Sequence, residues 1–172
     1  MKLPVLIMML FTTFILIACQ PGATQAPTYR SDHVEDVTYH AFRTNARYVW
    51  DGDRGIMVIE ELEELENYLS ANDTQFDFTR TDPTFKSYVE NKETAFFDDH
   101  YLILIKLQEV SGSIWHELDT LEVENDTLMV TLNAHVPEIG TTDMAAWHLI
   151  IEVPKASYTF DDVALSVTRI QE

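Results

Sequence analysis

Six histidines and 29 acidic residues are the side chains of this sequence that could bind a metal or transfer a proton. Alternation along the predicted strands puts His116 and His148 on faces with apolar neighbours, and His135 on a mixed face. His116 and His148 could meet if their strands pair. Because no His-x-His or His-x-x-x-His spacing is present, we expect each imidazole to be hydrogen-bonded and partly buried, and we predict no metal site.

Two acidic motifs could bind a cation. Asp98-Asp99-His100 could form a divalent-cation patch, or a carboxylate there could orient the imidazole, but we expect a helix end and a solvated turn. Asp51-Gly52-Asp53 resembles the start of an EF-hand loop. Its next glycine, Gly55, falls at the fifth position, whereas Ile56 and Leu62 occupy the sixth and twelfth positions, which require glycine and glutamate. We therefore reject an EF-hand.

Nucleophilic catalysis has little support in the sequence. Ser111-Gly112-Ser113 lacks the Gly-x-Ser-x-Gly spacing of a nucleophile elbow, and Gly112 and Gly140 stand alone rather than in a phosphate-binding loop. The chain has one cysteine, Cys19, and lipidation there would leave no thiol for chemistry. We expect a protein that is not an enzyme and needs no cofactor.

The first residues form a targeting segment. Lys2 supplies a positive charge, and Val5 to Ala18 form an apolar run that is too short for a membrane-spanning helix, which needs roughly 20 residues. The run ends in Leu16-Ile17-Ala18-Cys19, which resembles the lipobox of bacterial lipoproteins. We expect cleavage after residue 18 and a lipid anchor on Cys19, which would hold the chain at the extracytoplasmic face of a membrane. The alternative is an ordinary secretory signal with an incidental cysteine.

Length and charge limit the organisation and the partners. Removing residues 1–18 from 172 leaves 154 residues, which suits a tether over 19–36 and a single domain over 37–172. The tether is rich in Pro, Gly, Thr and Ser. A net charge of −18 repels nucleic acid and anionic headgroups, so we predict no nucleic-acid partner. The charge serves either solubility or the binding of cations or basic polypeptides.

Apolar periodicity predicts a compact α+β fold, mostly antiparallel sheet, with one or two helices in its first half. Residues 101–107 form a continuous apolar run that suits a strand covered on both faces. Asn125-Asp126 marks a hairpin turn, and Leu128, Val130 and Leu132 point to one side of the next strand. We expect strands at 37–42, 47–50, 56–59, 101–107, 114–123, 128–132, 147–153 and 163–170, helices at 60–69 and 83–97, and an antiparallel meander late in the chain.

Four stretches resemble the PrcB C-terminal-type domain of bacterial envelope proteins: Val58–Leu62, Tyr101–Leu107, Ser111–Ser113 and His148–Lys155. They fall within about two-thirds of the mature chain. The sequence departs from that family at its bend, where the family favours a Gly-Gly-Tyr-like triplet and this chain has Gly112-Ser113-Ile114. The resemblance implies a protein-binding, assembly or stabilising role, and it supplies no catalytic residues.

The loop over residues 137–144 is the best candidate for a binding surface. It is long for a connection between strands and carries an acidic residue near each end. With nearby aromatic residues it could form a rim that anchors a partner. The alternative is an ordinary loop whose Trp and Met side chains belong to the core. The candidate rim comprises Gly112, Trp115, His116, Glu138, Gly140, Thr141, Thr142, Asp143, Met144, Trp147 and His148.

Together these features predict a lipid-anchored envelope protein that binds or stabilises another envelope protein without catalysis. One alternative is a lipoprotein that binds a solute or a divalent cation. A less favoured alternative is an envelope hydrolase that uses His116, His148 and Asp99.

Overall fold

The computed structural model describes residues 37–44, 54–80 and 84–172. The predicted leader and tether, the predicted strand at 47–50 and the Asp51–Asp53 turn lie outside these residues. Among the helices of the described ranges, none is long and apolar enough to cross a membrane.

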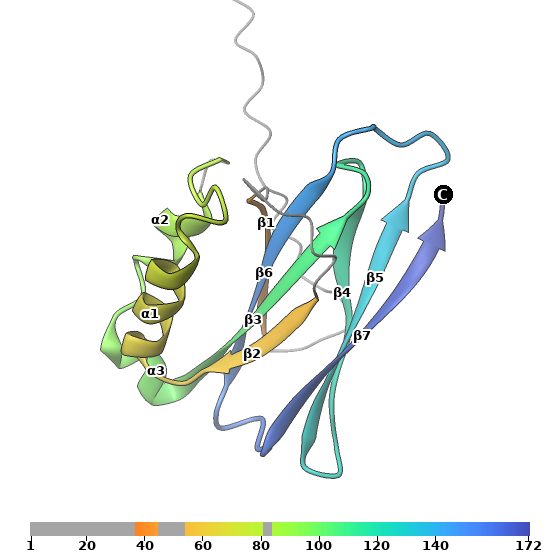
Figure 1. Ribbon diagram of the computed structural model, residues 1–172. Coiled ribbons are helices and arrows are strands. Elements are labelled where there is room, and N and C mark those ends of the chain that lie inside the picture. The colour runs from red at the N-terminus through yellow and green to blue at the C-terminus, as the bar shows by residue number, and fades with distance from the viewer. Residues whose placement is uncertain (1–36, 45–53, 81–83) are drawn as a thin grey trace, which may run out of the picture.

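The described elements form three layers (Figure 1): helices pack on one face of a four-stranded sheet, and a three-stranded sheet covers the other face. The α+β class is confirmed, with three short helices where we expected one or two. In chain order the elements are β1 (Thr38–Arg43), β2 (Gly55–Ile59), α1 (Leu62–Asn72), α2 (Phe85–Val89), α3 (Thr94–Asp99), β3 (His100–Glu109), β4 (Trp115–Glu124), β5 (Thr127–Val136), β6 (Ala145–Pro154) and β7 (Asp162–Gln171).

The four-stranded sheet has the antiparallel order β1-β6-β3-β2. Its central strands are covered on both faces, as the apolar run at 101–107 predicts. Leu102 and Leu104 pack against the helices, whereas Ile103 and Ile105 belong to the core between the two sheets. A strand buried on both faces cannot alternate apolar with polar residues, so the run is continuous.

The three-stranded sheet has the order β4-β5-β7. Asn125 and Asp126 connect β4 to β5 with φ angles of 49° and 62°, which confirms the predicted hairpin turn. Leu128, Val130 and Leu132 are fully buried on one face of β5, as expected.

The expected antiparallel meander is wrong. Strand β7 pairs with β5 in parallel, and β6 leaves this sheet to lie between β1 and β3. The burial of β6 and β7 explains why β7, and not β6, lies beside β5. Leu149, Ile150 and Ile151 are completely buried and need cover on both faces, which only a central position in a covered sheet provides. Strand β7 is largely exposed and suits an edge.

The expected single helix at 83–97 is also wrong, because the chain forms α2 and α3 with a break at residues 90–93. Thr84 and Ser87 form a capping box that starts α2. The apolar stripe begun by Phe85 and Val89 would continue at positions 92 and 93, which are Lys and Glu. A continuous helix would turn these charges toward the core, so the chain breaks there.

Candidate functional site

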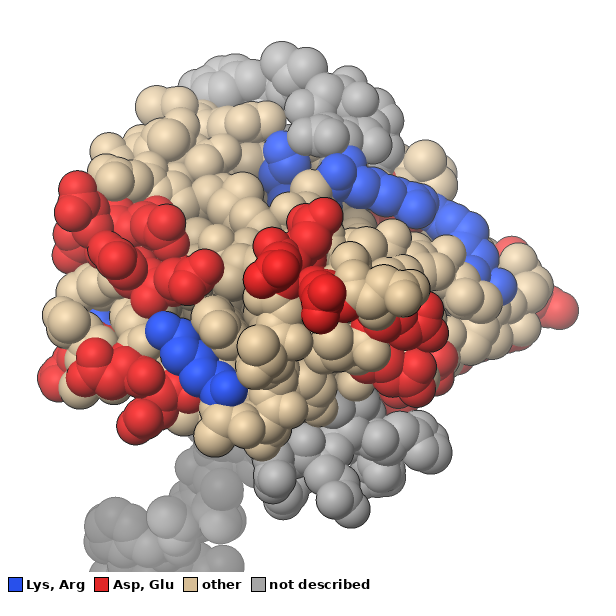
Figure 2. Space-filling view, turned by 90° about the horizontal axis from the view of Figure 1, so that it is seen from below, with Lys and Arg blue, Asp and Glu red and all other residues tan. Residues whose placement is uncertain are grey.

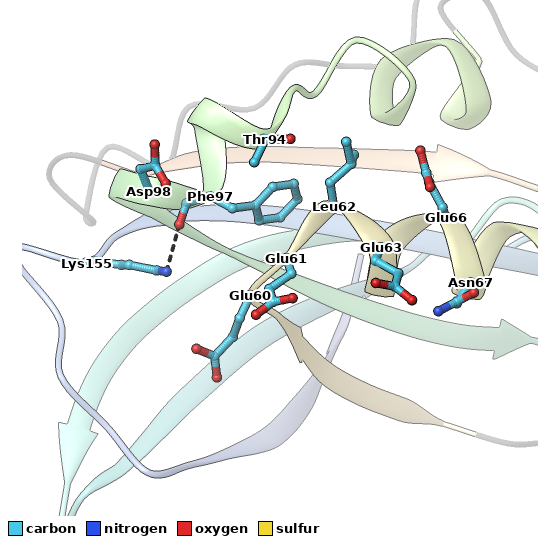
Figure 3. Close-up of a pocket in the computed structure, with 10 residues that line it drawn as sticks. All are labelled: Glu60, Glu61, Leu62, Glu63, Glu66, Asn67, Thr94, Phe97, Asp98 and Lys155. Atoms are coloured by element: carbon cyan, nitrogen blue, oxygen red, sulfur yellow. Dashed lines mark hydrogen bonds between the residues drawn. The ribbon is translucent and has the colours of Figure 1, made fainter.

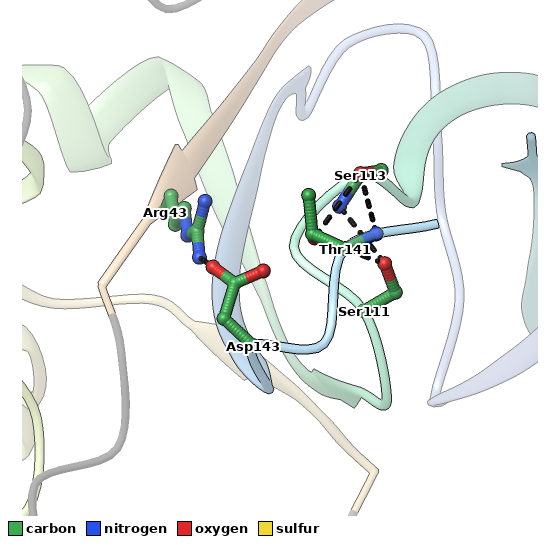
Figure 4. A network of polar contacts seen from close by, with 5 residues as sticks. All are labelled: Arg43, Ser111, Ser113, Thr141 and Asp143. Carbon is green, nitrogen blue, oxygen red and sulfur yellow. Dashed lines mark hydrogen bonds and ion pairs between the residues drawn. The ribbon is translucent and has the colours of Figure 1, made fainter. Parts of the chain in front are cut away.

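The β3–β4 and β5–β6 loops lie at one end of the molecule and are joined by hydrogen bonds (Figure 4). The Gly112 N–H donates to the carbonyl oxygen of Asp143 at 2.7 Å. The Ser113 hydroxyl donates to Thr141 Oγ1 and accepts from the Thr141 N–H, both at 3.1 Å. Ser111 Oγ lies 3.1 Å from the same Thr141 hydroxyl. These bonds make the two loops one structured surface.

An ion pair adds a third segment to this end of the molecule. Arg43, the last residue of β1, pairs with Asp143 (Figure 4). Hydrogen bonds from Thr141 and from Arg43 lower the pKa of Asp143 to about 2, because both stabilise the ionised carboxylate. The Asp143 carboxylate is therefore charged at any physiological pH and holds the loop against β1.

Two glycines permit the close approach of the loops. A Cβ on Gly112 would lie 2.6 Å from Asp143 Oδ2 and would also overlap the Arg43 guanidinium. A Cβ on Gly140 would lie 2.9 Å from Ser111 Oγ. A side chain at either position would displace the neighbouring side chains that join the loops. The two glycines of the candidate rim thus act through packing rather than through contact with a partner.

Three large apolar side chains on these joined loops face solvent. Ile139 is 89% exposed, Val110 is 65% exposed and Met144 is 56% exposed. Exposed apolar residues scattered singly are ordinary, whereas a contiguous apolar patch marks a contact surface, so the shared position of these three on joined loops makes them the residues to test for binding. Glu138 and Thr142 of the candidate rim are also exposed, and both belong to the same loop as Ile139 and Met144.

His116 lies beneath these loops in a buried polar cluster and is not at the surface. Its Nε2 is 3.1 Å from Glu109 Oε1, and Arg169 donates to Glu109 Oε2 at 2.6 Å. The Glu109 side chain is only 1% exposed. Although burial alone would raise the pKa of Glu109, hydrogen bonds from His116 and Arg169 outweigh burial and lower it. The carboxylate thus links β3 of one sheet to β4 and β7 of the other.

His116 and His148 could meet only if their strands paired, but β4 and β6 belong to different sheets, and the two imidazoles lie on opposite sides of the four-stranded sheet. His148 is fully buried against the helices, with Nδ1 2.7 Å from Thr44 Oγ1 and Nε2 2.6 Å from the Tyr68 hydroxyl. Burial, with a smaller contribution from Lys106, lowers the pKa of His148 to about 3. The expectation of a hydrogen-bonded interior imidazole is confirmed, and full burial makes His148 a structural residue.

The two tryptophans of the candidate rim differ in position. Trp147 is partly buried, packs against the core between the sheets and meets the His116 ring edge-on, with the ring centroids 5.9 Å apart. Trp115 lies on the outer face of the three-stranded sheet, where its ring stacks flat on His135 at 3.8 Å. His135 in turn contacts Glu117 and Glu172. Trp147 therefore supports the rim from within, and Trp115 flanks it.

The Asp98-Asp99-His100 motif occupies the opposite end of the molecule. His100 stacks on Phe96 with the ring centroids 5.0 Å apart, and the Asp99 carbonyl accepts the Lys155 N–H. The motif is thus a helix end, as expected. In the described part of the chain, no group of three or more His, Asp or Glu side chains is arranged to hold a metal ion.

Sequence reasoning missed Val110, Ile139 and Arg43 at the rim, and Glu109 and Arg169 beneath it. Ile139 could have been selected from the sequence, because it is a large apolar residue in a polar loop and does not continue the apolar face of any helix or strand. Glu109 could have been selected too, because it is an acidic residue only two positions after the apolar run of β3. Arg43 and Arg169 are distant in sequence, and only the sheet pairing shows where they lie.

No protein-family model, no curated protein and no solved structure matches this chain.

Proposed function

We propose that this chain is a lipid-anchored protein of the bacterial envelope that binds another envelope protein through the candidate rim, without catalysing a reaction. The observation that carries the proposal is the exposure of Val110, Ile139 and Met144 on two loops held together by hydrogen bonds. A surface that is already ordered loses little conformational entropy when a partner binds, and apolar side chains supply the area to be buried.

The position at which β1 begins supports a rim that faces away from the membrane. The first residue of β1, Thr38, pairs with Glu152, whereas the rim adjoins Ala145 at the other end of β6. Seven residues of an extended strand cover about 23 Å. A tether from a lipidated Cys19 would therefore join the fold at the end remote from the rim, and the rim could face a partner.

Two sequence features support the proposal independently. The apolar run that ends in Leu16–Cys19 supports the anchor. The resemblance to the PrcB C-terminal-type domain supports a binding or stabilising role, and the β3 and β6 stretches that carry this resemblance form the centre of the main sheet.

Mass spectrometry of the mature protein tests the anchor. We expect an N-terminal Cys19 whose mass is increased by a diacylglyceryl group, and loss of membrane association in Cys19→Ala. An unmodified N-terminus, or cleavage elsewhere, would refute the anchor and leave the binding surface to be tested separately.

Affinity capture from native envelopes tests the binding surface. The full-length protein should retain a defined partner, and Ile139→Asp should reduce that yield at least about tenfold, since a buried aliphatic side chain contributes about 1.5–3 kcal/mol. Val123→Asp is the matched control, because Val123 is 42% exposed near the hairpin turn at the far end of β4. An equal loss of yield in both variants would contradict binding at the rim.

A further inference from the structure

A concave surface lies at the end of the molecule opposite the rim. A cavity of about 920 Å³ is lined by the start of α1, by α3 and by the residue that follows β6 (Figure 3). A neighbouring cavity of about 410 Å³ lies between α1 and the α2–α3 connection, and both are lined by Leu62, Glu66 and Thr94. We call the two together the helical groove.

The floor of the helical groove is apolar because the helices do not cover α1 completely. Leu62, Leu65 and Leu69 form one stripe of α1 at spacings of three and four residues. Leu65 is buried in the core, whereas Leu62 and Leu69 are only partly buried and line the groove. The connection between α2 and α3 faces this stripe across the smaller cavity, so Leu62 and Leu69 remain only partly covered. Phe97 of α3 points toward Leu62 across the floor (Figure 3).

The walls of the helical groove are strongly acidic. Seven carboxylates and two lysines line the two cavities. Both lysines already have partners, since Lys92 pairs with Glu152 and Lys155 Nζ donates to the Phe97 carbonyl at 2.7 Å. Glu63 and Glu66 of α1 and Glu60, which precedes the helix, are exposed. The view from below shows several groups of acidic side chains and fewer basic ones on this side of the molecule (Figure 2).

We propose that the helical groove binds a basic, amphipathic segment of a partner protein. An apolar floor seven residues long on one helix matches the i, i+3, i+4 and i+7 anchors of an amphipathic helix. Lysines and arginines on the flanks of such a segment would meet the carboxylates at the walls, which favours fast association and excludes acidic competitors. Anionic headgroups would be repelled by the same charge, so the groove fits a peptide rather than a membrane surface.

Two synthetic helical peptides of equal length test this proposal, one built from leucine and lysine and one in which glutamate replaces every lysine. Their affinities for the full-length protein are measured by fluorescence anisotropy in 150 mM salt. We expect only the lysine peptide to bind. Glu63→Gln/Glu66→Gln should raise its Kd about tenfold, in line with the usual strength of exposed charge pairs.

Matched variants distinguish binding of the lysine peptide in the groove from its general electrostatic attraction to an acidic protein. Glu122→Gln/Glu124→Gln removes the same charge from exposed positions of β4 and should change the Kd less than about twofold. Leu62→Asn should also weaken binding about tenfold, with its thermal unfolding midpoint measured to show that the fold persists. Equal effects of the two glutamine pairs, or no binding of the lysine peptide below about 1 mM, would overturn the proposal. Ile139→Asp should leave this Kd unchanged, so the groove and the rim are tested independently.

Discussion

Gly112 donates its backbone N–H to the Asp143 carbonyl oxygen at 2.7 Å, and this bond joins two loops that are 31 positions apart in the sequence. Around it, the hydroxyls of Ser111, Ser113 and Thr141 and the Arg43 ion pair complete one ordered surface. The exposed apolar residues of that surface therefore keep a defined arrangement before any partner arrives.

The glycine at position 112 is required by this packing. We expect Gly112→Ala to lower the free energy of unfolding by about 1 kcal/mol, because its Cβ would displace the ends of the Asp143 and Arg43 side chains and disturb their ion pair. Gly55→Ala is the control, since its Cβ would lie 3.8 Å from the nearest atom, an ordinary contact. Urea unfolding measures both variants. Equal effects would show that displacing the Arg43 and Asp143 side chains has no cost.

The buried carboxylate beneath the rim should dominate local stability. We expect Glu109→Ala to lower the free energy of unfolding by about 1–3 kcal/mol, because the buried His116 loses its hydrogen-bond partner and Arg169 loses its carboxylate. Glu172→Ala removes an exposed carboxylate that pairs with His135, and it should cost about 0–1 kcal/mol. Denaturant titration of the two variants tests this difference. A loss below about 1 kcal/mol for Glu109→Ala would refute the role of the cluster.

His148 should make the fold sensitive to mild acid. Its pKa is about 3 in the folded protein and about 6.5 in the unfolded chain, so the unfolded chain binds the extra proton between these values. The stabilisation that comes from burying a neutral His148 is fully present above pH 6.5. Below that pH the free energy of unfolding falls by about 1.4 kcal/mol for each pH unit, down to the folded-state pKa. Urea unfolding between pH 7 and pH 5, above the range where most carboxylates titrate, measures the slope.

A variant without the imidazole provides the comparison for that slope. His148→Gln should be less stable at pH 7, because Thr44 and Tyr68 lose well-placed partners, yet its stability should change less between pH 7 and pH 5. If the pH slope were the same in both proteins, another group would be responsible.

Features of the fold that depend on local periodicity could be predicted from the sequence. The continuous run of β3, the turn at Asn125 and Asp126, and the alternation of β5 all occur as expected, because each depends on residues close together in the chain. Pairing depends on distant residues. The transfer of β6 to the other sheet and the parallel pairing of β7 were therefore missed.

The candidate site was predicted in part for the same reason. Gly112, Thr141, Asp143 and Met144 lie together at the rim, since both loops end strands at the same side of the fold. His148 was misplaced because alternation assigns a residue to a face of its strand, but it does not say which layer covers that face.

Site-specific photo-crosslinking in living cells tests the central claim, that the rim contacts another envelope protein. A photoreactive residue replaces Ile139 in one strain and Val123 in a second, at two exposed positions on different ends of the fold. We predict a discrete crosslinked protein species from position 139 that position 123 does not give. The same crosslinked species from both positions, or none from position 139, would contradict the account.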